Sequence, residues 1–480
     1  MMKRRDALKT IGGLAGAAGL AKFLPACGDG DDGPVGITTY VYLMLENRTY
    51  DHVFGARKLE GLPGEGLTAG LANPDMNGNM IAPYVPAVED LCVLDPPHGW
   101  EASHLQFNNG AMDGFVTEHQ KDHSSTTLRD PMQYLNRAYQ PISWALADAY
   151  TTCDHWFASV MGPTLPNRAY WHTATSFGLK ANNDVLDKFA SVPVPTIYNR
   201  LQDKQVDWAY YFGNLAVVSL LGSPGPFQLD LGPNDGTGHI RRFGDPAAGG
   251  GQFFKDAAAG KLPPVVYIDP SFSENDDHPP VHPVRAQALI AAVYTALAKS
   301  PQWKNCMLVV TYDEHGGFYD HVAPPVNPAD DTLAKFGVDG FQQLGFRVPT
   351  MVAGPYAKQG HVSAVQYDHT SALKELQNAF GLEPLNARMD AANDLSDCID
   401  MDRLARGEWA PPVELPEINL DDWAWQDMKC KSAGGFRYND PISEWADKNP
   451  GKLAREYDLR GADPEQQVVR EFLRKHQRSR

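Results

Sequence analysis

Cysteine is scarce in this sequence, which has six cysteines in 480 residues and none spaced as Cys-x-x-Cys. A zinc site built from thiolates normally needs such spacing, so this class of metal site is disfavoured. Internal repeats and long low-complexity tracts are also missing. The hydrophobic content of 43% and the charged content of 21% are those of an ordinary globular protein. These features exclude repeat arrays, fibrous proteins and disordered chains.

Basic residues are few relative to acidic ones, with 42 Lys and Arg against 59 Asp and Glu. Residues 1–26 hold five of the basic residues and one acidic residue, so the remainder has 37 against 58. A chain this acidic is not expected to bind nucleic acid or to be drawn electrostatically to anionic membranes. We therefore predict no nucleic-acid partner, and any membrane association must come from a lipid anchor or from the substrate.

No apolar run is long enough for a good membrane-spanning helix, because the stretch at 11–24 is short and rich in glycine. It follows the basic Lys3-Arg4-Arg5, and this order is typical of an export signal of the twin-arginine type over residues 1–27. The "LPAC" that ends at Cys27 resembles a lipoprotein cleavage box, in which Cys27 would be lipidated. The alternative is an exported protein cleaved nearby. Either way we predict an exported protein, periplasmic or at the cell surface.

Hydrophobic periodicity predicts an α/β fold with a mostly parallel sheet covered on both faces, because apolar, β-branched runs alternate with helical stretches. Strands are predicted at 37–45, 263–269, 307–312 and 348–354, and helices at 141–156, 283–300 and 367–381. We assign 36–400 to one catalytic domain and 401–480 to a C-terminal wrapping segment. Among the cysteines, Cys398 and Cys430 are predicted to pair, and Cys306 is predicted to lie in a buried strand.

Polar side chains follow the predicted strands, at the point where each strand ends. Glu46 and Asn47 follow the first, and Asp313 and Glu314 follow the third. In an open parallel sheet, the carboxyl ends of strands gather ligands at one edge. Neighbouring carboxylates repel each other unless a cation or a proton neutralises them, and carboxylate and amide oxygens suit a hard divalent cation. A turn or a helix cap is the alternative for any one of these residues. The combination predicts a metal site.

The segment "GPTLPNR" at 162–168 predicts the start of a helix near Thr164. One interpretation makes Thr164 a helix-capping residue. The other makes it a nucleophile, since a helix N-terminus stabilises an incoming anion and a bound metal would activate the hydroxyl. On the second interpretation Thr164 is also a metal ligand, and Arg168 or Asn167 holds phosphate oxygens.

Several histidines lie in loops among proline, glycine and acidic residues, where proton transfer and anion binding are common roles. We predict that His278 is the general acid for a leaving oxygen and that His98 contacts phosphate. Four others are interpreted as supporting or structural residues: His104, His282, His321 and His369.

Six ordered motifs, spread over about residues 38–382, resemble the bacterial phosphoesterase family of C-type phospholipases and related acid phosphatases. They are "ENRTYDHVFG", "PHGW", "GPTLPNR", "DDHPP", "TYDEHGGFYDHVAPP" and "RVPTMVAGPYAKQGHV" with the "YDHTS" that follows it. The resemblance implies an alkaline-phosphatase-like three-layer α/β/α fold. It also implies a metal held at Glu46, Asn47, Asp313 and Glu314, with Thr164 as nucleophile. "TLPNR" fits the frame of related sulfatases, but threonine cannot give the aldehyde that those enzymes need.

The residues and the resemblance together predict metal-dependent hydrolysis of phosphate esters, of the phospholipase C type on phosphodiester head groups. The alternatives are an acid phosphatase acting on monoesters and a non-catalytic surface lipoprotein that binds ligands. Oxygen ligands fit Ca, Mg or Mn, and Zn fits if a histidine joins them. Substrates are predicted to be phospholipids or small phosphoesters. The aromatic run at 206–213 is either buried core or the lining of a choline pocket.

Overall fold

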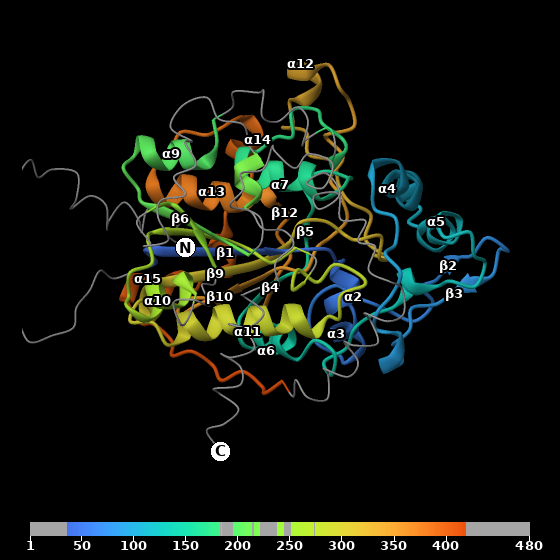
Figure 1. Cartoon of the computed structure of the whole chain (residues 1–480), viewed down its shortest axis with the longest axis horizontal. Coiled ribbons are helices and arrows are strands. Elements are labelled where there is room, and N and C mark those ends of the chain that lie inside the picture. The colour runs from blue at the N-terminus through green and yellow to red at the C-terminus, as the bar shows by residue number, and fades with distance from the viewer. Residues whose placement is uncertain are drawn as a thin grey trace, which may run out of the picture.

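The protein forms three layers, with helices packed on both faces of an eight-stranded sheet. The computed structural model describes residues 36–182, 184, 195–213, 216–220, 238–243, 251–272 and 274–418. The predicted export signal, Cys430 and the part of the wrapping segment beyond residue 418 lie outside these residues. Figure 1 shows the sheet edge-on between α7, α9 and α13 on one face and α6, α10 and α11 on the other.

The sheet has the strand order β11-β4-β10-β9-β1-β8-β6-β7. Its strands are β1 (Thr39–Leu45), β4 (Thr151–Cys153), β6 (Trp208–Phe212), β7 (Ile240–Arg242), β8 (Val265–Asp269), β9 (Cys306–Tyr312), β10 (Met351–Ala353) and β11 (His361–Ser363). Strands β9, β1, β8, β6 and β7 run parallel, and β10 is antiparallel to both of its neighbours. This topology confirms the predicted α/β fold with a mostly parallel sheet.

The helices of the two covering layers are α6 (Pro141–Ala149), α7 (Thr164–Thr173), α9 (Ile197–Asp203), α10 (Gln252–Ala258), α11 (Val284–Ala298) and α13 (His369–Phe380). The smaller helices are α2 (Tyr50–Phe54), α3 (Ala56–Leu59), α4 (Trp100–Phe107), α5 (Phe115–Asp122), α12 (Thr332–Phe336), α14 (Ala387–Ala391) and α15 (Met401–Arg406). Two short strand pairs lie outside the main sheet, β2 (Asn73–Pro74) with β3 (Met80–Ile81) and β5 (Trp156–Phe157) with β12 (Tyr367–Asp368).

The helix predicted at 141–156 is too long. It ends at Ala149, where Tyr150 takes an extended conformation. The β-branched Thr151 and Thr152 then pair with β10 and β11 as strand β4. Pairing with partners some two hundred residues away thus outweighs the local helical pattern, which a single stretch of sequence does not reveal.

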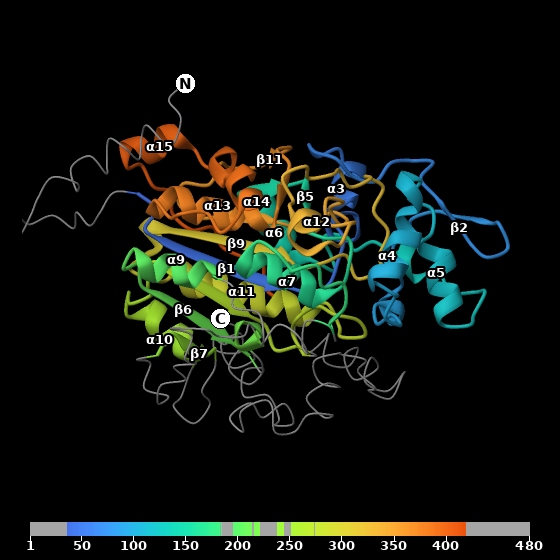
Figure 2. The same cartoon turned by 90° about the horizontal axis from the view of Figure 1, so that it is seen from above.

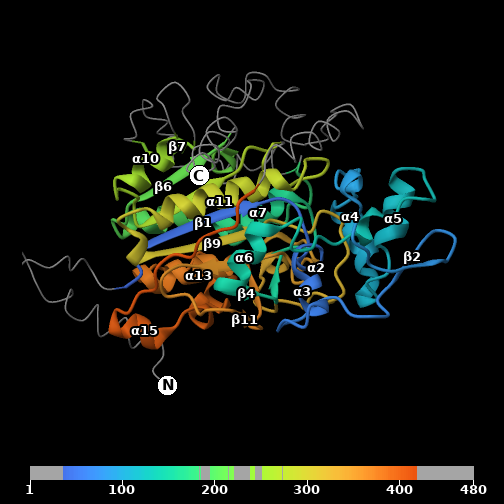
Figure 3. The ribbon, with the colours of Figure 1, turned by 90° about the horizontal axis from the view of Figure 1, so that it is seen from below.

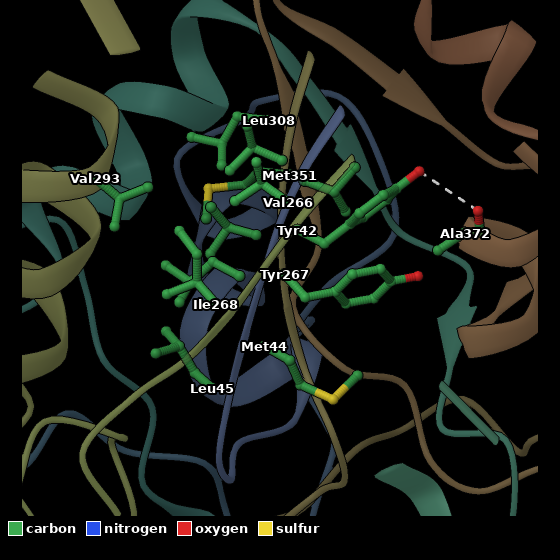
Figure 4. Close-up of a cluster of buried hydrophobic side chains, with 14 of the residues drawn as sticks. Tyr42, Met44, Leu45, Val266, Tyr267, Ile268, Val293, Leu308, Met351 and Ala372 are labelled. Carbon is green, nitrogen blue, oxygen red and sulfur yellow. Dashed lines mark hydrogen bonds between the residues drawn. The ribbon is translucent and has the colours of Figure 1, made fainter. Parts of the chain in front are cut away.

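The core between the layers follows from strand alternation, because successive side chains point to opposite faces of the sheet. Figure 4 shows Tyr42 and Tyr267 on the side of α13, and Val266 and Ile268 on the side of α11. All four side chains are buried. Continuous apolar strands are required here because both faces are covered.

The aromatic run at 206–213 belongs to this core. Trp208, Tyr210 and Tyr211 lie in β6 and are buried. They therefore do not line an open pocket for a choline group.

Cysteine pairing differs from the prediction. Cys398 is a free thiol in the core, with its Sγ atom 3.6 Å from that of Cys153. The predicted Cys398–Cys430 disulfide is therefore wrong, because the Cys398 side chain faces β4 in the interior. Cys306 is buried at the start of β9, as predicted. No helix among the described residues is both long and apolar enough to cross a membrane.

One group of elements projects beyond the carboxyl ends of the central strands. Figure 1 shows α4, α5 and the β2–β3 pair at this end of the molecule, and Figures 2 and 3 show α4, α5 and β2 there, next to α3. The carboxyl edge of the sheet and these projecting elements together enclose the polar residues described next.

The residues that follow α15 pack back against the domain. The indole nitrogen of Trp303 donates a hydrogen bond to the carbonyl of Ala410 (2.9 Å).

Candidate active site

The two predicted pairs of oxygen ligands meet at the carboxyl ends of β1 and β9. Leu45 and Tyr312 are register partners, and the backbone nitrogen of Asp313 donates to the carbonyl of Leu45 at 3.0 Å. Asn47 then donates from Nδ2 to Oε1 of Glu314 at 2.8 Å. Glu46, Asn47, Asp313 and Glu314 are all buried. Parallel pairing of the two strands thus brings together residues that lie 267 positions apart.

Arg168 of α7 binds three carboxylates at this edge. Its Nε donates to Oδ2 of Asp313 (2.9 Å), Nη1 to Oδ1 of Asp269 (3.0 Å) and Nη2 to Oε2 of Glu46 (3.3 Å). Asp269 ends β8, the strand on the other side of β1. The sequence suggested that Arg168 contacts phosphate oxygens, whereas here its guanidinium group is committed to the ends of three strands.

The site carries an excess of buried negative charge. Glu46, Asp269 and Asp313 share one buried guanidinium group, and Glu314 is buried beside Asp313. Burial, only partly offset by Arg168, raises the pKa of Asp313 to about 6. Oδ1 of Asn47 is a buried oxygen with no hydrogen-bond partner. This donor set fits a hard divalent cation, which would neutralise the carboxylates and use the Asn47 oxygen.

His98 and His315 flank Glu314 on its two oxygens. Nε2 of His98 lies 3.7 Å from Oε1, and Nδ1 of His315 lies 3.2 Å from Oε2. Nδ1 of His98 donates to the carbonyl of Pro96 at 2.7 Å, which fixes the ring. Burial opposes the charge on His98, but Glu314 and Asp95 outweigh it and raise its pKa to about 9. The two carboxylates thus favour the charged form of His98.

His278 joins the same site through Asp95. The rings of His98 and His278 have centroids 5.4 Å apart. Oδ1 of Asp95 lies 3.6 Å from Nδ1 of His98 and 3.9 Å from Nε2 of His278. Nδ1 of His278 donates to the carbonyl of Pro279 at 2.6 Å. Asp95, His98 and His278 form one of two groups among the described residues with the composition of a metal site.

Thr164 is the first residue of α7 and is buried. Arg168 follows it by four positions, so the two side chains share one face of the helix. Because Arg168 binds Asp313 and Glu46, that face is directed at the carboxyl edge of the sheet. Thr164 therefore lies on the face of α7 that is turned to the carboxyl edge of the sheet.

Asn167 fixes the turn that precedes Thr164. Its Oδ1 accepts from the backbone nitrogen of Val160 (3.0 Å), and its Nδ2 donates to the carbonyl of Gly162 (2.9 Å). All of its polar atoms are thus used within the turn, so Asn167 does not hold phosphate oxygens as the sequence suggested. Asn182 accepts from the backbone nitrogen of Leu165 at 2.8 Å and holds the turn from the other side.

The other histidines have separate surroundings. His369 donates from Nε2 to the carbonyl of Asp313 (2.7 Å) and so supports that residue from behind. His282 accepts from the backbone nitrogen of Val284 (3.1 Å) at the start of α11. His104 stacks on Trp100, with ring centroids 4.6 Å apart.

His321 belongs to the second group with metal-site composition, which also includes Asp51 and Asp320. Nδ1 of His321 lies 2.6 Å from Oδ2 of Asp51. Arg347 binds both carboxylates, at 3.0 Å to Asp51 and 2.9 Å to Asp320. Burial opposes the charge on His321, but Asp51 and Asp320 outweigh it and raise the pKa of His321. The guanidinium and imidazole groups together therefore face the two carboxylates.

Asp95, Asp269 and His315 belong to the site but are not among the site residues selected from the sequence. His315 had a signal, because it directly follows Glu314. Asp95 lies in the loop before α4, and nothing in its neighbours indicates that the loop folds back over Glu314.

Comparison with known proteins identifies the family to which this fold and site belong. Residues 37–383 match the model of the Phosphoesterase family. The chain belongs to this family and is a hydrolase of phosphoric esters.

Curated relatives include non-specific phospholipase C6 of Arabidopsis thaliana, which is 32% identical over 410 residues, covering 80% of this chain and 75% of the relative. Phospholipase C B of Mycobacterium tuberculosis is 31% identical over 388 residues, covering 71% and 73%. Among solved structures, a protein in the alkaline phosphatase superfamily from Vibrio parahaemolyticus aligns at 11% identity and a TM-score of 0.35. The alignment covers 65% of this chain and 82% of the Vibrio chain. The fold assignment rests on the sheet topology described above.

Proposed function

We propose that the protein hydrolyses phosphate esters in a metal-dependent reaction with Thr164 as nucleophile, as a phospholipase C acting on phosphodiester head groups. The observation that carries the proposal is the position of Thr164 at the start of α7, on the same helical face as Arg168, which binds Asp313 and Glu46. The phospholipase C activity printed in the names of the relatives supports the choice of substrate. An acid phosphatase acting on monoesters is the second candidate.

Glu46, Asn47, Asp313 and Glu314 would hold the metal ion, with the Thr164 hydroxyl as a further ligand. A divalent cation at this position lowers the pKa of a bound hydroxyl and neutralises charge on phosphoryl oxygens. Calcium, magnesium, manganese and zinc all remain candidates, zinc with a histidine ligand. The unpartnered Oδ1 of Asn47 and the excess of carboxylates support this assignment.

The protein's own residues then divide the reaction between them. The Thr164 hydroxyl gives up its proton to water and attacks phosphorus in line, and the bond to the departing alcohol breaks. The phosphoryl group, which in a diester keeps its head-group alcohol, is then bonded to the Thr164 oxygen. His278 gives its proton to the departing oxygen. The cationic His98 contacts phosphate oxygens. A water molecule then attacks the phosphorus on Thr164 and regenerates the hydroxyl, and the product released is the phosphorylated head group from a diester or inorganic phosphate from a monoester. Arg168 positions Asp313 and Glu46 and does not contact the substrate.

We propose in addition that the chain is exported through residues 1–27 and is tethered to a membrane if Cys27 is lipidated. The motif that ends in "LPAC" supports this location. Mass spectrometry of the mature N-terminus tests it, and an unmodified N-terminus downstream of Cys27 would contradict the tether.

Chelation and a ligand variant test the metal requirement. We expect a strong chelator to abolish hydrolysis of p-nitrophenyl esters, and added divalent cations to restore it. Asp313→Asn removes one buried charge from the site, so we expect the metal content of the purified protein to fall severalfold by elemental analysis. Unchanged metal content in this variant would exclude Asp313 as a ligand.

A diester and a monoester compared in the same assay separate the two candidate activities. We expect faster turnover of methyl p-nitrophenyl phosphate than of p-nitrophenyl phosphate. The reverse order would favour the acid phosphatase. Absence of turnover on both, with metal bound, would favour the non-catalytic binding protein.

Gly316 offers a sharper test of Asn47. Its backbone has φ 63°, and a Cβ atom there would lie 2.3 Å from Oδ1 of Asn47. We expect Gly316→Ala to displace Asn47 and to lower kcat/KM by about a hundredfold, in the range seen when groups that orient a metal site are disturbed. Gly337→Ala is the matched control, because Gly337 has φ 71° with open space around its Cα. Equal activity in the two variants would contradict the role of Asn47.

A further inference from the structure

Trp100 forms the wall between His98 and the turn that precedes Thr164. A Cβ atom on Gly162, two residues before Thr164, would lie 3.3 Å from Cε3 of Trp100. On the other side, His98 is two residues before Trp100 and lies 3.7 Å from Glu314. The indole ring therefore lies between the loop that carries His98 and the turn that precedes Thr164.

A lysine already occupies this aromatic wall. Nζ of Lys180 lies 4.3 Å from the centroid of the Trp100 ring and 5.9 Å from that of Phe341. The segment that carries Lys180 is fixed against the nucleophile turn, because Asn182 accepts from the backbone nitrogen of Leu165 at 2.8 Å. The ammonium group is thus held beside the site by its chain as well as by the ring.

Among the residues that the structure describes, the positive charge of Lys180 is not paired with a carboxylate. In the part of the chain that the structure describes, no carboxylate lies within ion-pair distance of Lys180. His104 stacks on Trp100 at 4.6 Å and does not add charge, because burial, with a smaller contribution from Lys180, lowers the pKa of His104. The wall therefore presents one ammonium group on an aromatic face.

Aromatic faces bind quaternary ammonium groups through cation–π attraction. The ammonium group of Lys180 already occupies a face of the Trp100 ring. A cationic group of a substrate that approached this ring would therefore be repelled by Lys180. We propose, building on the phosphoester hydrolysis proposed above, that Lys180 makes the site discriminate against head groups that carry a positive charge. The favoured substrates are phosphoesters in which the head-group alcohol, which stays bonded to phosphorus after cleavage, is uncharged or anionic. A polyol head group is an example.

Binding of two reaction products tests this selectivity without requiring turnover. Phosphocholine carries a quaternary ammonium group, and inorganic phosphate does not. We expect isothermal titration calorimetry on the full-length protein loaded with its metal to show weaker binding of phosphocholine than of phosphate. In Lys180→Met we expect the affinity ratio of phosphocholine to phosphate to rise about tenfold, because a like-charge repulsion at short range is removed. Lys180→Gln gives a second variant with the same expected direction.

Lys335→Met is the matched control. Lys335 lies in α12 with its side chain half exposed and pairs with Asp331 at 2.7 Å, so its loss changes net charge equally without altering the Trp100 wall. We expect no change in the affinity ratio. An equal ratio in Lys180→Met and wild type, tighter wild-type binding of phosphocholine, or no binding of either anion would overturn the proposal. Loss of hydrolysis alone would count against the proposed function instead, because this readout needs no chemical step.

Discussion

Thr164→Ala is expected to lower kcat for phosphoester hydrolysis by about a thousandfold or more, since removal of a nucleophile eliminates the covalent route. The fold should be retained, because Thr164 is the first residue of α7 and the turn before it is held by Asn167 and Asn182. Steady-state assays on p-nitrophenyl esters, with circular dichroism as a check of folding, measure both effects.

Two control variants separate a chemical role from a structural one. Thr164→Ser keeps a hydroxyl and should retain far more activity than Thr164→Ala. Thr173→Ala is the second control. Thr173 lies at the other end of α7, where its hydroxyl donates to the carbonyl of Ala169 at 2.8 Å. It should cost stability but little activity. Near-normal turnover in Thr164→Ala would exclude the assigned nucleophile.

Arg168→Met is expected to destabilise the metal-free protein by about 3–5 kcal/mol, the usual cost of leaving buried charges without their partner. The change removes the common donor to Asp313, Asp269 and Glu46. Arg168→Lys should restore only part of the loss, because one ammonium group cannot reproduce the planar fork. Urea unfolding followed by fluorescence measures the difference.

The stability lost in Arg168→Met should increase with pH. Burial raises the pKa of Asp313 to about 6 from an ordinary value of 3.8. The folded metal-free state therefore binds more protons than the unfolded state between these values, and its stability falls as the pH rises from about 4 to 6. Arg168 lowers the pKa values of Asp313 and Asp269, so its removal raises both further. The Arg168→Met variant should therefore lose more stability at pH 8 than at pH 5.

Arg200→Met is the control for this comparison. Arg200 is partly exposed and lies 3.6 Å from Asp203, so its loss should change stability by less than about 1 kcal/mol at either pH. A similar small effect for Arg168→Met would show that the buried carboxylates do not depend on the guanidinium group.

The central strands were predictable because their sequence satisfies a simple physical condition. A strand buried on both faces must be apolar throughout, and β1, β8 and β9 show this pattern. The end of α6 was not predictable in the same way. Thr151 and Thr152 follow a helical pattern without a break, and only their pairing with β10 makes them a strand.

The candidate site divides along the same line. Glu46, Asn47, Asp313 and Glu314 could be selected because each pair directly follows a strand, and the parallel arrangement then brings the pairs together. The binding of Arg168 to these carboxylates could not be predicted, because Glu46, Asp269 and Asp313 lie at the ends of three different strands. Asp95 likewise depends on how a loop folds back over Glu314. Residue type indicates what a side chain can bind, whereas tertiary structure decides which partner it meets.

The covalent state of Thr164 during turnover tests the central claim most directly. The wild-type protein would be mixed with p-nitrophenyl phosphate, quenched in acid within one turnover, digested and examined by tandem mass spectrometry. The proposed reaction predicts one phosphoryl group on the Thr164 side chain, absent in Thr164→Ala and absent without substrate. Efficient hydrolysis with no phosphorylated Thr164 at any quench time, or a phosphoryl group on another residue, would contradict it.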